Sequence, residues 1–333
     1  MTDLSLEALA ARRQFLSLLA AGAGLAAFPA RAQGFPARPI KVIVPYAPGG
    51  GPDVLTRKVG PRLSEILGQP VVVENIVGAG GILAAQQVAR AAPDGYTLML
   101  GASTHIVQKA MQPAVKFDPV KDFAHIIRAT TSPQLLVVAA SAPWKTVQEL
   151  IAAIRKEPGK LNYASGGIGS AAHLASAAMV LAAEVQAVHV PYKGSVEIIP
   201  SILSGSTQFG CPVASTAVGP VQQGTVRALA TTGATRLAQW PNVPTLKEAL
   251  GKDELAIESW SGIWAPAGTP AAVVDVLFRA YQKLYSDPAI RADHLAAGAA
   301  VALSESPAEF SRFVESETAK YQRLVKATGI STT

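Results

Sequence analysis

Residues 40–53, IKVIVPYAPGGGPD, combine a β-branched run with a loop rich in glycine and proline. Ile40–Val44 is typical of a buried strand, and residues 53–67 are predicted to form a helix. Three glycines let the loop turn with its N–H groups facing a concavity. Pro52 suits a first helical turn because it lacks an N–H, and Asp53 can cap the helix start. The unit predicts either an anion site at a helix N-terminus or a plain turn that needs glycine for its geometry.

A second stretch repeats this order. Residues 161–164 predict a strand, residues 165–169 a glycine loop, and residues 170–183 a helix. The hydroxyls of Ser165 and Ser170 would add to the backbone donors. His173 is either a ligand contact or, as we favour, a packed or capping side chain. Two such loops could hold one carboxylate from two sides.

Two further loops could line the same site. Residues 78–81 precede a helix but lack the third glycine and the acidic partner of a dinucleotide-binding site, so they predict a turn. Residues 191–195 end a strand, where ligands of open α/β sheets gather. Lys193 in this segment would attract an anion, or is a solvated surface lysine.

The remaining pattern alternates short β-like runs with helical stretches, which predicts an α/β protein with mainly parallel sheets. The pattern restarts at Leu161, after a strand over residues 134–140 and a helix over residues 144–156. We expect residues 134–260 to form a second lobe, inserted into a first lobe of residues 33–133 and 261–333. Two chain crossings would then join the lobes.

The first 32 residues have the three-part layout of a bacterial export signal. Arg12 and Arg13 precede an apolar run over residues 16–28, and Ala30-Arg31-Ala32 offers a cleavage site. The pattern favours the twin-arginine route over an ordinary secretory leader. Either leader directs the mature chain to the periplasm.

Composition restricts the classes of function. The net charge of +6 is a modest excess that favours anionic ligands, and the basic residues are scattered, which is unlike a nucleic-acid-binding protein. Cys211 is the only cysteine, so an internal disulfide is impossible and no lipid-anchor cysteine follows the leader. The sequence shows neither a Gly-x-Ser-x-Gly elbow nor a phosphate-binding Gly-Lys-Ser/Thr, and its histidines lack paired metal spacing. We therefore expect a non-enzyme that needs no metal or cofactor.

In these and further short motifs, the mature chain resembles the Bug (TctC-like) family, the extracytoplasmic solute receptors of tripartite tricarboxylate transporters. The resemblance extends over nearly the whole mature chain as an ordered series of short motifs. They are residues 43–50 with Asp53, residues 73–75 with 78–81, residues 93–98, residues 162–165 with His173 and Leu174, residues 190–194, 227–230 and 243–245, and Trp260, Gly262 and residues 265–270.

The resemblance implies a two-lobed, type II-like periplasmic-binding fold that closes on a small organic carboxylate, held largely by backbone N–H groups and water. It also implies delivery to a membrane permease of one large and one small subunit, with the receptor as a monomer. A sensing receptor for a membrane signalling protein and an exported hydrolase or lyase are the alternatives. The predicted ligand contacts are Tyr46, Ala47, Gly49, Gly50, Gly51, Asp53, Ser103, Ser165, Gly166, Gly167, Ile168, Gly169, Ser170, His173, Tyr192 and Lys193.

Several positions depart from the family pattern. Gly51, Ala171 and Ala172 stand where the family often has small hydroxyl residues, and Ile76-Val77 replaces a common Arg-Pro. An acidic residue frequent in the family is absent around residues 208–211. Contacts from backbone N–H groups to a carboxylate do not depend on these side chains. The part of the pocket farther from the carboxylate becomes less polar. We expect a mono- or dicarboxylate with an apolar or aromatic body rather than a densely charged tricarboxylate.

Overall fold

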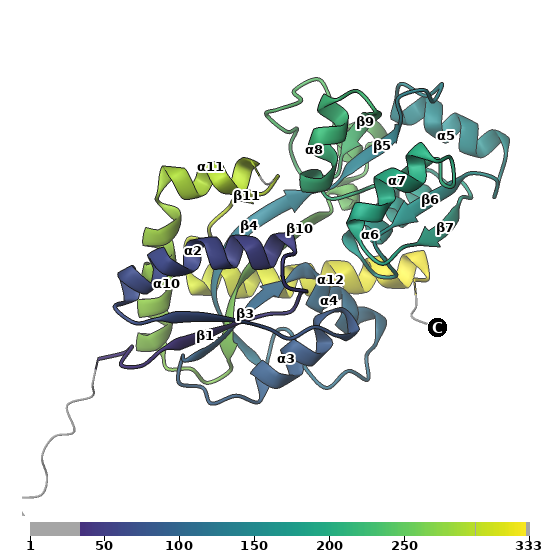
Figure 1. The fold of residues 1–333 in the computed structure, drawn as a ribbon. Helices are drawn as coiled ribbons and strands as arrows, with labels where there is room; N and C mark the ends of the chain where they lie inside the picture. Colours follow the sequence, from purple (N-terminus) through teal and green to yellow (C-terminus); the bar gives the residue numbers. More distant parts are fainter. Residues whose placement is uncertain (1–33, 297, 331–333) are drawn as a thin grey trace, which may run out of the picture. The chain divides into compact units, whose positions relative to one another are not determined.

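Two β-sheets, each accompanied by helices, organise the chain (Figure 1). A computed structural model describes residues 34–296 and 298–330, so the predicted leader lies outside the described residues. The six-stranded sheet has the order β11 (Ala300–Val301), β4 (Phe123–Pro133), β10 (Glu258–Pro266), β3 (Thr97–Ala102), β1 (Ile40–Val44) and β2 (Val71–Asn75). The five-stranded sheet has the order β7 (Val188–Pro191), β6 (Asn162–Ser165), β8 (Phe209–Gly210), β5 (Leu135–Ala139) and β9 (Val226–Thr231).

The helices follow the strands in the chain order expected of an α/β protein. Those that follow strands of the six-stranded sheet are α2 (Gly51–Leu67), α3 (Ile82–Ala89), α4 (Ser103–Met111), α10 (Ala271–Tyr285), α11 (Pro288–Ala296) and α12 (Pro307–Thr328). Those between strands of the other sheet, and after it, are α5 (Val147–Lys156), α6 (Ala171–Ala182), α7 (Ile198–Leu203), α8 (Ala214–Gln222) and α9 (Leu246–Leu250). Among the described residues, none of these helices has both the length and the apolar character needed to span a bilayer.

Strand β1 lies in the interior of its sheet because four of its five residues are apolar, and of these five only Lys41 is exposed. Ile40, Val42, Ile43 and Val44 are fully buried, and β1 pairs in parallel with β2 and β3. An apolar run without alternation is typical of such a doubly covered parallel strand. The glycine loop follows the carboxyl end of β1 and therefore lies where the strands of the sheet end.

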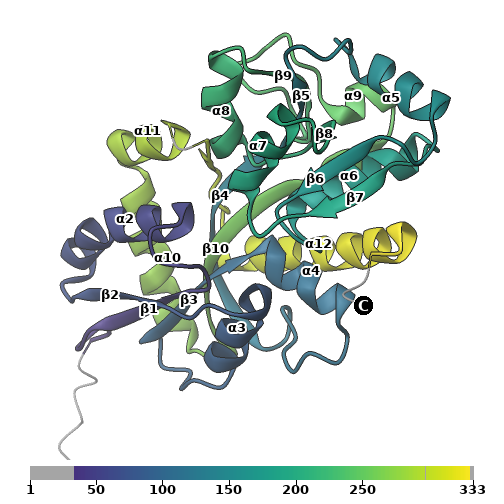
Figure 2. The same ribbon diagram turned by 45° about the vertical axis from the view of Figure 1, so that its right-hand side comes forward.

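The prediction of mainly parallel sheets is wrong, because both sheets are mixed. Strand β10 is antiparallel to β3 and β4, β11 is antiparallel to β4, and β5 is antiparallel to β8 and β9. The chain leaves the six-stranded sheet along β4 and returns to it along β10, so these two long strands run in opposite directions (Figure 2). The passage out lies between Pro133 and Leu135, and the passage back lies between Ile257 and Glu258.

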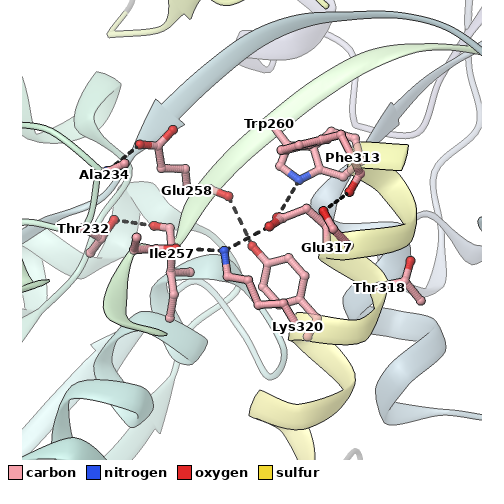
Figure 3. Close-up of polar contacts among 12 residues, drawn as sticks. Thr232, Ala234, Ile257, Glu258, Trp260, Phe313, Glu317, Thr318 and Lys320 are labelled. Atoms are coloured by element: carbon pink, nitrogen blue, oxygen red, sulfur yellow. Dashed lines mark hydrogen bonds and ion pairs between the residues drawn. The ribbon is translucent and has the colours of Figure 1, made fainter. Parts of the chain in front are cut away.

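Helix α12 holds the returning passage through a partly buried polar network (Figure 3). The Glu317 carboxylate accepts from the Trp260 indole N–H at 3.0 Å and pairs with the Lys320 ammonium at 3.0 Å. Lys320 also donates to the carbonyl of Ala256 at 2.8 Å, and the Tyr321 hydroxyl donates to the carbonyl of Glu258 at 3.2 Å. The passage is thus bonded to α12 immediately before β10 begins and again within that strand.

Residues that follow β9 of the five-stranded sheet also bond to the returning passage. The Ala234 N–H donates to the Glu258 carboxylate at 2.9 Å, and the Thr232 hydroxyl lies 2.5 Å from the carbonyl of Ile257 (Figure 3). Gln134, at the outgoing passage, donates to the Ser259 hydroxyl at 2.9 Å. The two passages are therefore connected to each other as well as to their sheets.

Two imidazoles lie against Trp264 in the core of the six-stranded sheet. The ring centroids of His105 and His125 are 5.6 and 5.2 Å from the Trp264 ring, and both histidines are almost fully buried. Burial lowers the pKa of each to about 4, because the charged form loses its hydration. Both rings are therefore neutral in the folded protein near neutral pH.

We predict that Glu317→Ala lowers the free energy of unfolding by about 1–3 kcal/mol, because the Trp260 N–H and the Lys320 ammonium lose their shared acceptor. Urea unfolding at pH 7 measures the change. The matched control is Glu315→Ala, an exposed position on the same helix that has no ion pair among the described residues. That control should change stability by less than about 0.5 kcal/mol. Equal effects of the two substitutions would contradict the assigned role of Glu317.

We predict that stability falls as the pH falls from about 6.5 toward 4. The unfolded chain has ordinary histidine pKa values near 6.5, so it takes up protons before the folded chain does. Each buried ring should add a slope of up to about 1.4 kcal/mol per pH unit in that window. His125→Gln retains a donor for the carbonyl of Pro119, which His125 contacts at 2.9 Å, but cannot titrate. Urea unfolding between pH 7 and 4.5 should show a shallower slope for this variant, and an unchanged slope would refute the assignment.

Candidate ligand-binding site

The first glycine loop connects β1 to α2 and is held from behind by Asp53. This carboxylate is 2% exposed and accepts from the Gly49 N–H at 2.8 Å, Asn75 Nδ2 at 2.8 Å and Arg57 Nε at 2.9 Å. The Gly49 hydrogen bond, then that of Asn75, together with the Arg57 guanidinium, lowers the pKa of Asp53 below its ordinary value. Asn75 also donates to the carbonyl of Tyr46 at 3.0 Å. The Asp53 carboxylate therefore bonds to the loop backbone, and the Gly49 N–H is not free to bind a ligand.

Several backbone donors of this loop are left over, and two of them lie at the start of α2. Among the described residues, the N–H groups of Gly51 and Asp53 have no acceptor, and Pro52 between them has no N–H to offer. They lie in the first turn of α2, where the helix dipole places partial positive charge. Because Gly51 is exposed, this helix end can meet a ligand from solvent.

The second loop, residues 165–170, connects β6 to α6 and uses its side-chain polar groups internally. The Ser165 hydroxyl lies 2.7 Å from His189 Nε2 and 3.1 Å from the carbonyl of Gly167. The Ser170 hydroxyl caps α6 by accepting from the His173 N–H at 3.2 Å. His173 Nδ1 accepts from the Gly169 N–H at 3.1 Å. The interpretation of His173 as a packed, capping residue agrees with these contacts.

Backbone donors also remain unused in the second loop. Within the part of the chain that the structure describes, the N–H groups of Ile168, Ala171 and Ala172 have no acceptor. Ala171 and Ala172 are the first two residues of α6, and Ile168 is 44% exposed. The second loop thus repeats the arrangement of the first, in which a helix N-terminus carries free donors and a glycine N–H beside it is bonded to a side chain.

Helix α4 connects the two loops. The Tyr46 hydroxyl bonds to the Thr104 hydroxyl at 2.9 Å, and burial of Tyr46 raises its pKa. A Cβ at Gly169 would overlap the sulfur of Met111 and would lie 3.6 Å from Val107. Thr104 precedes Val107 by three residues and Met111 by seven, which is roughly 5–10 Å along a helix. The two loops therefore contact one helix at points close enough for one small molecule to meet both.

The other predicted contacts have different surroundings. Gly166 and Gly167 lie against residues 192–195, since a Cβ at Gly166 would be 2.8 Å from the Ser195 nitrogen and one at Gly167 would be 3.4 Å from the carbonyl oxygen of Tyr192. Lys193 is exposed, and its backbone N–H donates to Glu197 at 2.8 Å. Ser103, in contrast, is 5% exposed, and its hydroxyl interacts with Tyr321 of α12. Thr104, Val107 and Met111 were not singled out by the sequence, although they join the loops.

A cavity elsewhere contains only solvent-sized space. It lies between α2, α10 and the six-stranded sheet, has a volume of about 40 Å³, and is lined in part by Leu63, Tyr281, Tyr285 and His294. That volume suits a water molecule or two rather than an organic ligand. None of the sixteen predicted contacts lines it. No cluster of three or more His, Cys, Asp or Glu side chains that could hold a metal ion occurs among the described residues.

Comparison with known proteins gives one consistent family. The model of the tripartite tricarboxylate transporter family receptor, TctC, matches residues 55–330. Protein BugT of Bordetella pertussis is 31% identical over 316 residues, which cover 94% of this chain and 96% of BugT.

Two solved structures of relatives contain carboxylates. A Rhodopseudomonas palustris protein with adipate has a TM-score of 0.78 and 31% identity, covering 89% of this chain and 99% of that protein. MatC from the same species, with bound malate, has a TM-score of 0.75 and 32% identity, covering 87% and 100%. The resemblance and the two-sheet α/β periplasmic-binding class expected from the sequence are confirmed.

We predict that Gly166→Ala lowers the free energy of unfolding by about 1–3 kcal/mol, since the new methyl group would press on the backbone of residues 194–195. Gly194→Ala is the matched control from the facing segment. Gly194 has an extended backbone that any residue adopts, and a Cβ there meets nothing closer than 4.0 Å. Chemical denaturation of the two variants measures the difference. If both variants match the parent protein, the two segments are not in close contact.

Proposed function

Because this chain belongs to the TctC family of tripartite tricarboxylate transporter receptors, we propose that it captures a small organic carboxylate in the periplasm and delivers it to a two-subunit membrane permease. The members of the family are solute-binding receptors rather than enzymes. We further propose that the receptor acts as a monomer without a cofactor. The ligand would lie between the lobe that contains the six-stranded sheet and the lobe that contains the five-stranded sheet.

The observation that carries the proposal is the pair of helix N-termini with unused donors. Gly51 and Asp53 at α2, and Ile168, Ala171 and Ala172 at α6, have N–H groups without an acceptor in the described chain. Free N–H groups and the positive end of a helix dipole favour an anion. A planar carboxylate has two oxygens, each of which accepts more than one hydrogen bond. One carboxylate can therefore engage both loops.

The energy of such a grip is sufficient for a transport receptor. A hydrogen bond to a charged group contributes about 1.5–3 kcal/mol, and micromolar affinity corresponds to about 8 kcal/mol. Three or four well-aligned N–H groups supply about 5–12 kcal/mol before the cost of association, and apolar contact with the ligand supplies the remainder. No cationic side chain is required for this result.

The side chains of the two loops favour a ligand with few charges. Neither loop contains a lysine or an arginine, and the nearby Arg57 guanidinium is already bonded to Asp53 and Asn75. The half-buried Ala171 and the exposed Ile168 add apolar surface beside the free donors. We propose a mono- or dicarboxylate with an apolar or aromatic body. The adipate and malate found in relatives belong to the dicarboxylate class.

Closure around the ligand would occur at the two passages between the sheets. The polypeptide crosses only beside Gln134 and beside Ile257 within the part that the structure describes, and the bonds among Gln134, Thr232 and Ser259 join these crossings. Two short connections that lie side by side permit rotation of one lobe against the other while each sheet stays intact. A carboxylate that bonds to both loops would favour the closed arrangement, because only there do both sets of donors reach it.

We predict that the purified protein binds a dicarboxylate such as adipate or malate and does not bind the matching neutral diamide, because free N–H donors at helix N-termini select negative charge. Isothermal titration calorimetry measures both ligands under the same conditions, with tricarballylate and citrate added to test the preference for fewer charges. Equal binding of acid and diamide, or no binding of any organic acid, would overturn the proposal.

The variant Ala171→Pro tests the donor directly. Proline is suited to the first helical position, and Ser170 already has the extended conformation (ψ 158°) that a following proline requires. The substitution removes one free N–H and should weaken diacid binding by about tenfold or more. Ala171→Gly retains the N–H and serves as the control. If the proline variant folds normally and binds as tightly as the control, the α6 N-terminus does not hold the ligand.

A further inference from the structure

Two histidines meet behind the second loop and contact its two ends. His189 lies on β7 and His173 on the first turn of α6, and their rings are stacked with centroids 3.6 Å apart and planes inclined by 10°. Tyr163 stacks on His189 at 5.0 Å, and Phe209 stacks on Tyr163 at 5.6 Å. The four rings thus form one continuous stack under residues 165–170.

One ring holds the start of the loop. In the parallel pairing of β6 with β7, Tyr163 is opposite His189, so Ser165 projects on the same face two residues farther along. His189 Nε2 lies 2.7 Å from the Ser165 hydroxyl, and the Gly167 N–H donates to this hydroxyl at 3.2 Å. Through one serine, His189 therefore fixes the first turn of the loop.

The other ring holds the end of the loop. His173 Nδ1 accepts from the Gly169 N–H at 3.1 Å, while the His173 backbone N–H donates to the Ser170 hydroxyl. Gly169 has φ +74° and packs against Met111 and Val107 of α4, so its peptide orientation is closely determined. With the Gly169 N–H bonded to the imidazole, the unbonded donors on either side of it are those of Ile168 and Ala171.

The contacts of His173 require a neutral ring with its proton on Nε2, because an Nδ1 proton would face the Gly169 N–H. Burial, assisted by the neighbouring His189, lowers the pKa of His173 to about 3. Burial lowers the pKa of His189 to about 4. No ion pair involves either ring among the described residues, and the titratable groups near the stack are the Tyr163 phenol and the buried Cys211 thiol. The pair therefore orders the loop without adding charge to the site.

We propose that His173 and His189 are positioning residues of the ligand site, a stacked pair that fixes the backbone of residues 165–170 so that its unused N–H groups converge on the ligand. Neither ring contacts the ligand; both act through the loop. This assignment rests on the proposed function for its effect on affinity, but its geometry holds in the ligand-free protein and is tested there separately.

The first test uses the ligand-free protein. Long-range ¹⁵N–¹H correlation spectra of the imidazoles at pH 7 should show His173 as the neutral Nε2–H tautomer. Hydrogen exchange of the Gly169 amide should be at least about tenfold faster in His173→Leu than in the parent protein, as expected for loss of a hydrogen bond. In His173→Asn, whose side-chain oxygen can replace Nδ1 as acceptor, exchange should stay within about threefold of the parent. A different tautomer, or unchanged exchange in His173→Leu, overturns the assignment whatever the protein binds.

The second test measures adipate affinity by calorimetry. His173→Leu should weaken binding by about tenfold or more, and His173→Asn should restore it to within about threefold. Equal losses in the two variants would show that the acceptor at Nδ1 is not what matters. If His173→Leu does not fold, Ser165→Ala breaks the other end and should also weaken binding about tenfold, and unchanged affinity there refutes the role of His189. Absence of adipate, malate or other carboxylate binding in the parent protein would instead refute the proposed function and leave the first test standing.

Discussion

An anion-binding loop must keep some backbone N–H groups without a protein acceptor and must bond all its other polar groups. Unpaired donors lower stability, so they persist only where the surrounding contacts hold the backbone in place. In this chain, Gly51 and Asp53 keep free N–H groups while Gly49 is bonded to the Asp53 carboxylate, and Ile168 keeps a free N–H while Gly169 is bonded to an imidazole. The supports behind the loops, rather than the loops themselves, decide which donors face outward.

The two loops meet this requirement with different chemistry. Behind the first loop lies a carboxylate, which would repel an anionic ligand, but the Arg57 guanidinium offsets its charge and the Asn75 amide donates a hydrogen bond to it. Behind the second loop lie two neutral imidazoles, which accept a hydrogen bond without introducing a charge. The first support ties the loop to β2, on which Asn75 lies, and the second ties it to β7. Each loop is therefore positioned by the strand next to the one that it follows.

Local sequence predicted the strand-loop-helix units because their signals are short-range: the β-branched run of Ile40–Val44, the glycines, and the start of each helix. The ordered motifs also predicted the family, and both results are confirmed. Part of the error in strand direction traces to β4, whose residues 128–133 are polar or small and gave no strand signal, although β10 and β11 pair antiparallel with it. The contacts of His189 with Ser165, 24 residues away, and of Met111 with Gly169, 58 residues away, exist only in the folded chain. Local patterns do not contain such pairings.

Helix α12 relates the site to the passages between the sheets. It packs against α4, whose residues contact both loops, and against α6, which begins at the second loop (Figure 2). The same helix holds the returning passage through Glu317, Lys320 and Tyr321. A rotation that brings the α6 N-terminus toward α2 must therefore slide α6 over α12 while the passage stays bonded to it. Because packed helices slide by small steps while these hydrogen bonds hold α12 to the passage, α12 is the fixed element against which closure would occur.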